Sequence, residues 1–153
     1  MTEAISELSM IAASESDLDA LARMNADLIA DERGANPMTL DQLRDRFVDW
    51  MASGFWRVEL LRFDGETVGY ALYAEVEAEH EAGAQDLYLR QLFISRARRR
   101  LGLGRRAAAM LIAERATPGQ RLVLDVLAGN DVANAFWRAV GFEPYAITME
   151  RRA

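Results

Sequence analysis

The segment from Ser95 to Arg106 combines arginines and glycines in a pattern suited to an anionic ligand. It reads Ser-Arg-Ala-Arg-Arg-Arg-Leu-Gly-Leu-Gly-Arg-Arg and follows an apolar run that ends near Ile94. Gly102 and Gly104 stand where a helix is predicted to begin, and the first N–H groups of a helix have no partner within it. The helix dipole favours negative charge there, and glycine allows oxyanions to approach the backbone closely. The pattern predicts a polyphosphate site made of backbone N–H groups with arginine support.

Three other interpretations of this segment stay open. The spacing Gly102-x-Gly104-x-x-Ala107 also fits the fingerprint of dinucleotide-binding folds, with Asp125 at a tolerable distance for a ribose contact. That fingerprint turns directly from strand to helix, however, whereas seven residues separate Ile94 from Gly102 here. A basic helix on nucleic acid is the second interpretation, disfavoured by the net charge of −6. A solvated helix start, with arginines for solubility, is the third.

Charge is divided unevenly along the chain. Residues 1–89 contain 6 arginines and 19 acidic residues, whereas residues 90–153 contain 12 arginines and 5 acidic residues. There is no lysine. A basic half suits an anionic ligand, and an acidic half suits a cationic ligand that meets it. The alternative is that the uneven distribution reflects drift in surface charge without a function.

Length and composition restrict the classes of function. The 153 residues suit one domain over residues 1–153. The lack of cysteine excludes disulfides and thiol catalysis, and with His80 as the one histidine no metal site is expected. No apolar run approaches the roughly 20 residues that a membrane helix needs, and the start lacks the features of a signal peptide. We expect a cytoplasmic protein that contacts neither nucleic acid nor membrane.

The predicted elements form one sheet with helices around it. A capping box at Thr39 starts the second helix, and Asp64-Gly65 is a hairpin turn signal. The first helix is expected to begin after Ser14 or Ser16. The order predicts an α+β, three-layer fold in which an antiparallel sheet passes into a parallel portion, with helices on both faces. Strands are predicted over residues 5–13, 56–63, 66–74, 86–94, 121–127 and 144–151, and the later helices over 101–116 and 130–140.

Two motifs resemble those of the GNAT N-acetyltransferase family. The family's motif Gln/Arg-x-x-Gly-x-Gly/Ala reads Arg99-Arg-Leu-Gly-Leu-Gly104 here. Its next motif, an asparagine, an alanine and an aromatic before Gly-Phe, reads Asn130-Asp-Val-Ala-Asn-Ala-Phe-Trp-Arg-Ala-Val-Gly-Phe142. The resemblance is strong over residues 56–151. It implies the GNAT fold, a mixed, mostly antiparallel sheet of six to seven strands flanked by helices on both faces. It also implies transfer of acetyl from acetyl-CoA to a primary amine of a small molecule or peptide.

The resemblance also implies where acetyl-CoA binds. The end of the fourth strand would pair with the pantetheine arm, the next loop would hold the pyrophosphate, and the last helix would contact the cofactor from its start. A helix N-cap is the alternative role of Asn130, and the two roles are compatible. Family members commonly form dimers, so a homodimer is one expected state. The implied cofactor residues are Leu92, Phe93, Ile94, Arg99, Arg100, Leu101, Gly102, Leu103, Gly104, Asn130 and Trp137.

Proton transfer is the chemistry that such an enzyme must arrange. Asp125 stands where some relatives carry a glutamate base, and its alternative is a strand carboxylate paired with an arginine. The family usually places a tyrosine proton donor at the position of Trp137, and an indole N–H is not a usable acid. Tyr145 or Tyr88 would then protonate the leaving thiolate, or the thiolate would leave unaided. A further alternative is an acetyl-CoA-binding sensor or interaction domain without turnover.

Acidic side chains are candidates for binding the acceptor. Glu75 and Glu77 alternate with apolar residues after a strand, and either is also an alternative base. A solvated, charge-protected sheet edge is their other interpretation. Asp31 and Glu32 lie between the first two helices, where the family often builds its acceptor wall, or else they belong to a frayed helix end. The acidic first half of the chain favours a cationic acceptor.

Overall fold

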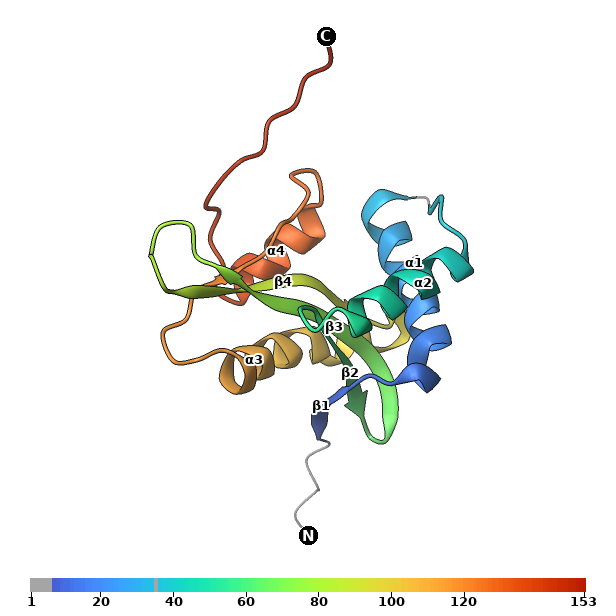
Figure 1. Ribbon diagram of the computed structural model, residues 1–153. Coiled ribbons are helices and arrows are strands. Elements are labelled where there is room, and N and C mark those ends of the chain that lie inside the picture. The colour runs from blue at the N-terminus through green and yellow to red at the C-terminus, as the bar shows by residue number, and fades with distance from the viewer. Residues whose placement is uncertain (1–6, 35) are drawn as a thin grey trace.

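A mixed sheet of five strands forms the centre of the computed structural model, which describes residues 7–34 and 36–153 (Figure 1). Neighbouring strands are antiparallel except for the last pair, which is parallel. The α+β class and the mostly antiparallel, mixed sheet are therefore as predicted. In spatial order the strands are β1 (Leu8–Ala12), β2 (Arg57–Phe63), β3 (Glu66–Glu77), β4 (Gln85–Ile94) and β5 (Leu122–Val123).

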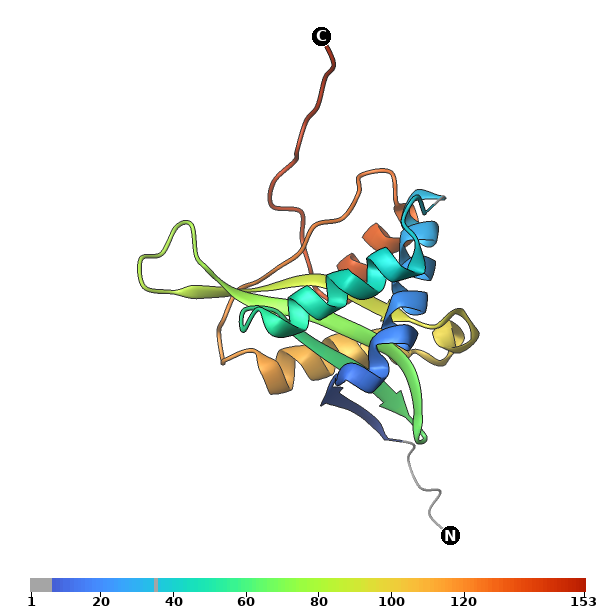
Figure 2. The ribbon, with the colours of Figure 1, turned by 45° about the vertical axis from the view of Figure 1, so that its right-hand side comes forward.

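Helices cover both faces of the sheet, which confirms the three-layer arrangement. Helices α1 (Leu18–Arg33) and α2 (Leu40–Ala52) lie over one face, and α3 (Leu103–Arg115) lies over the other (Figures 1 and 2). Helix α4 (Asp131–Ala139) packs beside the start of α3. Short 3-10 turns precede two of the helices, η1 (Glu15–Asp17) before α1 and η2 (Arg96–Leu101) before α3.

The alternation of side chains along the strands divides the core between these faces. Tyr70 and Leu72 of β3 pack under α1 and α2 with Phe47, and all three are fully buried. Leu87 of β4 packs under α3 with Leu103, and both are fully buried.

Two helix boundaries are explained by the residues at them. The Thr39 hydroxyl accepts a hydrogen bond from the Gln42 N–H at 3.1 Å, and the Gln42 side chain accepts one from the Thr39 N–H at 2.9 Å. This is the predicted capping box. Helix α1 ends at Gly34, which has a φ of 75° and therefore adopts a conformation that favours glycine.

The number of strands is smaller than the six to seven that were expected. The predicted strand over residues 144–151 does not form, and the chain after Phe142 runs away from the sheet (Figure 1). A strand needs the backbone of a neighbour, and this segment meets no sheet edge among the described residues of one chain. β5 is also shorter than the predicted range 121–127. The first residues of the predicted strand 5–13 lie outside the described part of the chain.

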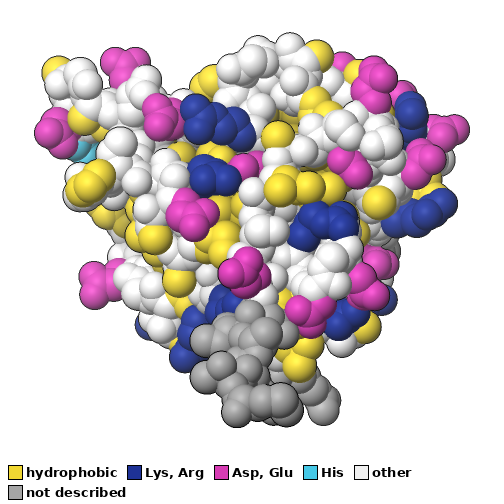
Figure 3. Space-filling view, turned by 90° about the horizontal axis from the view of Figure 1, so that it is seen from below, with side chains coloured by type: hydrophobic (Ala, Val, Ile, Leu, Met, Phe, Trp, Pro, Cys, Tyr) yellow, Lys and Arg dark blue, Asp and Glu magenta, His cyan; other side chains and the backbone are white. Residues whose placement is uncertain are grey.

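The uneven charge of the sequence is partly balanced by ion pairs within the fold. Several acidic residues of the first half pair with arginines of the second half, so part of the charge of each half is neutralised. On the face in Figure 3, arginine and acidic side chains are interspersed rather than separated. No helix among the described residues has both the length and the apolar character needed to cross a bilayer. The pairs between the halves are Arg96 with Asp27 and Asp31, Arg98 with Glu66, Arg99 with Asp31, Arg115 with Glu59, and Arg121 with Asp86.

Candidate functional site

The start of α3 presents backbone N–H groups that have no acceptor within the helix. Gly102 has a φ of 70°, and a side chain there would meet no atom within 4 Å. The N–H of Arg106 donates to the Gly102 carbonyl at 3.2 Å. The N–H groups of residues 103–105 precede this bond and have no acceptor within the helix. The first turn of α3 contains no acidic residue. This arrangement fits the polyphosphate predicted for the segment.

Gly102 and Gly104 have different structural roles. A Cβ at Gly104 would lie 3.3 Å from the ring of Phe136, so this glycine allows α3 and α4 to pack closely. Leu103 is fully buried and anchors the helix to the core, leaving only its backbone for a ligand, whereas Leu101 is 54% exposed. The side chain of Arg100 lies outside the described part of the structure.

The arginines before α3 are held by carboxylates and by backbone. Asp31, at the end of α1, accepts hydrogen bonds from Arg96 at 2.9 Å and from Arg99. Burial raises the pKa of Asp31, but the bonds from these two arginines outweigh it and hold that pKa below its usual value. The Nε of Arg99 also donates to the Ile94 carbonyl at 2.9 Å. Asp31, a candidate for the acceptor wall, is thus joined to the loop of the predicted polyphosphate site.

The second half of β4 has a strand on only one side. β5 pairs with β4 only at Leu87 and Tyr88, and then the two strands separate. Residues 89–94 therefore keep β3 as a neighbour and offer backbone groups on the other side. Phe93 and Ile94 bury their side chains in the core, so this edge is a backbone surface. An extended ligand chain fits such an edge by strand addition.

A β-bulge in β4 places two consecutive side chains on the α1/α2 face. Leu72 of β3 is opposite Gln91 and Tyr73 is opposite Leu89, so Arg90 is the additional residue. The side chain of Gln91 accepts hydrogen bonds from Asn25 at 3.2 Å and from Tyr70 at 2.8 Å. This network packs under α1, where the buried Oδ1 of Asn25 has no hydrogen-bond partner within the described chain.

Arg90 contacts two tryptophans on the same face. Its guanidinium lies 5.2 Å from the ring centroid of Trp50 and 5.2 Å from that of Trp56. Sequence reasoning missed Arg90, because an alternating strand pattern does not indicate where an additional residue will be inserted.

Asp125 and Tyr88 form a hydrogen-bonded pair beside the bulge. The Tyr88 hydroxyl donates to the Asp125 carboxylate at 2.8 Å. Burial and the adjacent Asp125 raise the pKa of Tyr88 above its usual value of 10.0, so the hydroxyl stays protonated at neutral pH. The Tyr88 ring lies 6.0 Å from that of Trp56. The partner of Asp125 is therefore a tyrosine, not the arginine considered from the sequence.

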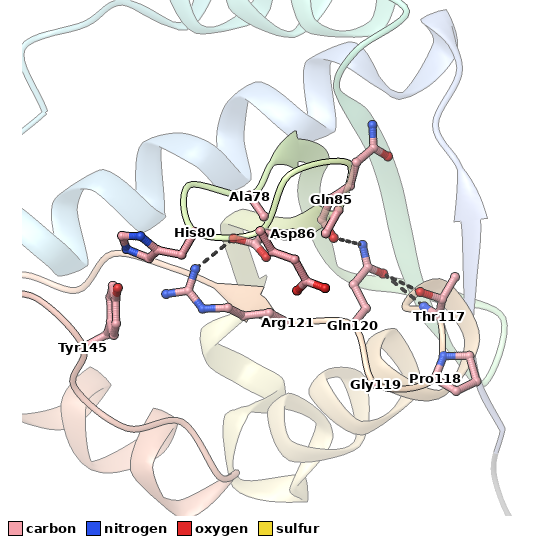
Figure 4. Close-up of a pocket in the computed structure, with 12 residues that line it drawn as sticks. Ala78, His80, Gln85, Asp86, Thr117, Pro118, Gly119, Gln120, Arg121 and Tyr145 are labelled. Atoms are coloured by element: carbon pink, nitrogen blue, oxygen red, sulfur yellow. Dashed lines mark hydrogen bonds and ion pairs between the residues drawn. The ribbon is translucent and has the colours of Figure 1, made fainter.

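Tyr145 lies in a different part of the molecule. It lines an open groove of about 550 Å³ between the β3–β4 turn and the loop after α3 (Figure 4). The Arg121 guanidinium is 4.5 Å from the ring centroid of Tyr145, and the His80 ring is 6.3 Å away. The groove is at the Gln85 end of β4, nine residues from Ile94, or about 30 Å along an extended strand. The structure does not bring Tyr145 to the predicted polyphosphate site at residues 95–106.

The remaining acidic candidates are separated from one another. Glu75 is opposite Leu87 and Glu77 is opposite Gln85, so strand alternation places both on the α3 face rather than the Tyr88 face. Glu32, in contrast, is at the end of α1. Burial raises its pKa, and its charge acts on the hydroxyl of Tyr70.

The start of α4 combines a cap with aromatic packing. The Asn130 side chain accepts a hydrogen bond from the Ala133 N–H at 3.1 Å, which confirms the N-cap. Trp137 packs against Phe136 and Phe142, with ring centroids 4.8 and 5.3 Å away. It lies partly buried against the core.

Comparisons with known proteins agree on one family. The model of the acetyltransferase (GNAT) family matches residues 21–142. The chain is similar to an aminoglycoside N-acetyltransferase, AAC(6')-Iy, solved in complex with CoA, with 13% identity over 100% of this chain and 99% of that chain and a TM-score of 0.75. An acetyltransferase from Thermus thermophilus has 27% identity over 89% and 86% of the two chains, with a TM-score of 0.72.

A third similar structure is glucosamine-6-phosphate N-acetyltransferase from Arabidopsis thaliana, with 14% identity over 95% of this chain and 98% of that chain and a TM-score of 0.67. No curated protein sequence matches the chain. The family match covers most of the chain, including the predicted polyphosphate site at residues 95–106, the bulged strand β4 and helix α4. The chain belongs to the acetyltransferase (GNAT) family and is an acetyl-CoA-dependent N-acetyltransferase.

Proposed function

We propose that the protein transfers acetyl directly to a primary amine of a small molecule or peptide, with Asp125 as the general base. The observation that carries this proposal is the Asp125–Tyr88 pair, which lies beside the bulge of β4 on the α1/α2 face. A carboxylate and a protonated hydroxyl at 2.8 Å could serve as the base and the proton donor of amine acetylation.

Acetyl-CoA supplies an activated acetyl group as a thioester, and this chain has candidate binding sites for its pyrophosphate and its pantetheine arm. The free N–H groups of residues 103–105 and the Arg99 guanidinium would hold the pyrophosphate. The open backbone of Leu92, Phe93 and Ile94 would pair with the pantetheine arm. Tyr88 is six residues before Ile94, about 20 Å along the strand, so a pantetheine arm paired with this strand would bring the acetyl group toward Tyr88 and the bulge.

The side chains then divide the proton transfers. Asp125 accepts the proton that the amine loses as its nitrogen bonds to the acetyl carbon. Tyr88 donates its hydroxyl proton to the sulfur as the carbon–sulfur bond breaks, and its hydrogen bond to Asp125 provides the path by which the captured proton returns. We assign this donor role to Tyr88 rather than Tyr145 because Tyr88 donates a hydrogen bond to Asp125, whereas Tyr145 lines the groove at the Gln85 end of β4.

Binding and turnover are tested separately. We expect 1 mM acetyl-CoA to raise the melting temperature, because a ligand at 100 times its Kd adds about 2.7 kcal/mol to the free energy of unfolding. We also expect thiol release when amines are added. Thiol release is measured with a panel of polyamines, aminoglycosides, amino acids and peptides. A raised melting temperature without turnover on any acceptor would favour the sensor, the alternative that Trp137 supports. An unchanged melting temperature would contradict the assigned cofactor site.

A homodimer is also proposed, with the C-terminal segment 144–151 as the contact. Tyr145, Ile147 and Met149 alternate along it and are 68%, 82% and 88% exposed, as in a strand that lacks its sheet. β5 is an edge strand on which a second copy's segment would add. We expect the full-length double variant Ile147→Asp and Met149→Asp to sediment as a monomer and the wild type as a dimer. Val132→Asp, 83% exposed on α4, is the control. A monomeric wild type, or a double variant that stays dimeric, would contradict this contact.

A further inference from the structure

Two arginines on the α1/α2 face differ from those of the phosphate loop because no carboxylate neutralises them. Within the described residues, neither Arg46 nor Arg90 forms an ion pair, whereas Arg96, Arg98 and Arg99 all do. The hydrogen bond from Arg46 goes to the sulfur of Met38, a weak acceptor, at 3.3 Å. Both guanidiniums therefore keep their capacity to bind an anion.

Aromatic rings hold these two guanidiniums in place. Arg46 lies 4.7 Å from the ring centroid of Trp50, and Arg90 lies 5.2 Å from the same centroid. Arg90 is the additional residue of the bulge, so its direction is fixed by the backbone as well as by Trp50 and Trp56. Burial, together with the charge of Arg90, lowers the pKa of Arg46. Arg46 is partly buried and Arg90 is exposed, and two like charges beside one ring favour the binding of an anion near them.

These guanidiniums are next to the groups that would handle the amine. Trp56, which contacts Arg90, also lies 6.0 Å from the ring of Tyr88, and Tyr88 donates to Asp125. The carboxylate of Asp125 and the guanidiniums of Arg46 and Arg90 therefore lie on the same face of the sheet.

We propose that the acceptor carries an oxyanion, a carboxylate or a phosphonate or phosphate group, in addition to its primary amine, and that Arg46 and Arg90 bind this oxyanion. Planar guanidiniums match the geometry of such groups and bind them through two hydrogen bonds. The proposal rests on the amine acetylation proposed above and specifies its substrate class. It replaces the simple cationic acceptor that the acidic half of the sequence favours, since those acidic residues are partly consumed by internal ion pairs.

Binding of acetylated products tests this inference without requiring turnover. The probes are N-acetylphenylalanine and N-phenethylacetamide, which differ only in the carboxylate, and N-acetyl-2-aminoethylphosphonate with N-ethylacetamide as a second pair. Tryptophan fluorescence reports binding, because Trp50 and Trp56 contact the guanidiniums. We expect the oxyanion member of at least one pair to bind at least about tenfold more tightly, since a hydrogen bond to a charged group contributes about 1.5–3 kcal/mol. Whichever pair shows the difference identifies the kind of oxyanion.

The variants Arg90→Met and Arg46→Met should remove this preference, while the stem of methionine keeps contact with the rings. Arg44→Met on the same helix is the matched control, because Arg44 is exposed and pairs with Asp19 at the surface. The control should keep the preference, and all variants should keep the acetyl-CoA-dependent rise in melting temperature. Equal binding within both pairs, or a preference that survives both substitutions, would overturn the inference. Thiol release from amines without an oxyanion would then still support amine acetylation, so the two proposals fail separately.

Discussion

Asp125→Asn is expected to lower kcat by about 10²- to 10⁴-fold while the affinity for acetyl-CoA stays within about twofold, since this is the usual contribution of a general base. The amide oxygen of asparagine still accepts the hydrogen bond from Tyr88, so the local structure is kept and only proton acceptance is lost. Asp125 is exposed, and a surface substitution of this kind usually changes stability by no more than about 0.5 kcal/mol. Steady-state thiol release and isothermal titration with CoA measure the two quantities.

Tyr88→Phe separates the two members of the pair. It keeps the ring beside Trp56 and removes the hydroxyl, so kcat should fall while the Km for acetyl-CoA is preserved. Because the pKa of Tyr88 is raised above 10.0, the hydroxyl is mostly protonated below pH 10.0. It loses its proton, and its ability to donate one, only at higher pH. The wild-type rate should therefore show an alkaline fall in that range, and the Tyr88→Phe profile should lack this fall. Unchanged turnover in Asp125→Asn at all pH values would exclude Asp125 as the base and leave Glu32 as the next carboxylate to test.

Gly102→Asp is expected to weaken acetyl-CoA binding by about tenfold to a thousandfold. The new carboxylate would stand at the start of α3, beside the N–H groups proposed for the pyrophosphate. Like charges at about 4 Å repel by about 1–4 kcal/mol, depending on solvent exposure, which corresponds to this range. The change in melting temperature with acetyl-CoA and titration with CoA both measure the effect.

Gly102→Asn is the matched control for that experiment. Asparagine and aspartate tolerate a positive φ similarly, and nothing lies within 4 Å of a Cβ at this position, so the two variants should share the same backbone cost. Binding should therefore differ between them by the charge alone. Gly104 is less informative, because any side chain there meets Phe136 and disturbs the packing of α3 on α4. If Gly102→Asp bound acetyl-CoA as tightly as Gly102→Asn, the phosphate site would have to lie elsewhere.

Local signals in the sequence predicted most elements of the fold. The capping box at Thr39, the turn at Asp64-Gly65 and the N-cap at Asn130 each depend on side chains within a few residues, and the structure contains each of them. The alternating patterns predicted β2 and β4 to within one residue at their starts. The segment 144–151 has an equally regular pattern but no partner strand in the described chain, so its pattern alone did not produce a strand.

By itself, the sequence indicated the family, which the family match confirms, and it predicted the location of the polyphosphate site. Both follow from short motifs, because the free N–H groups of a helix start and the glycine beside them are local properties. The tertiary structure alone decided which side chains meet across the sheet. The pairing of Asp31 with Arg99, of Tyr88 with Asp125, and of Arg90 with the two tryptophans joins residues far apart in the chain. Such pairs depend on strand register, on one additional residue in β4 and on the divergence of β4 from β5, and no local pattern encodes these features.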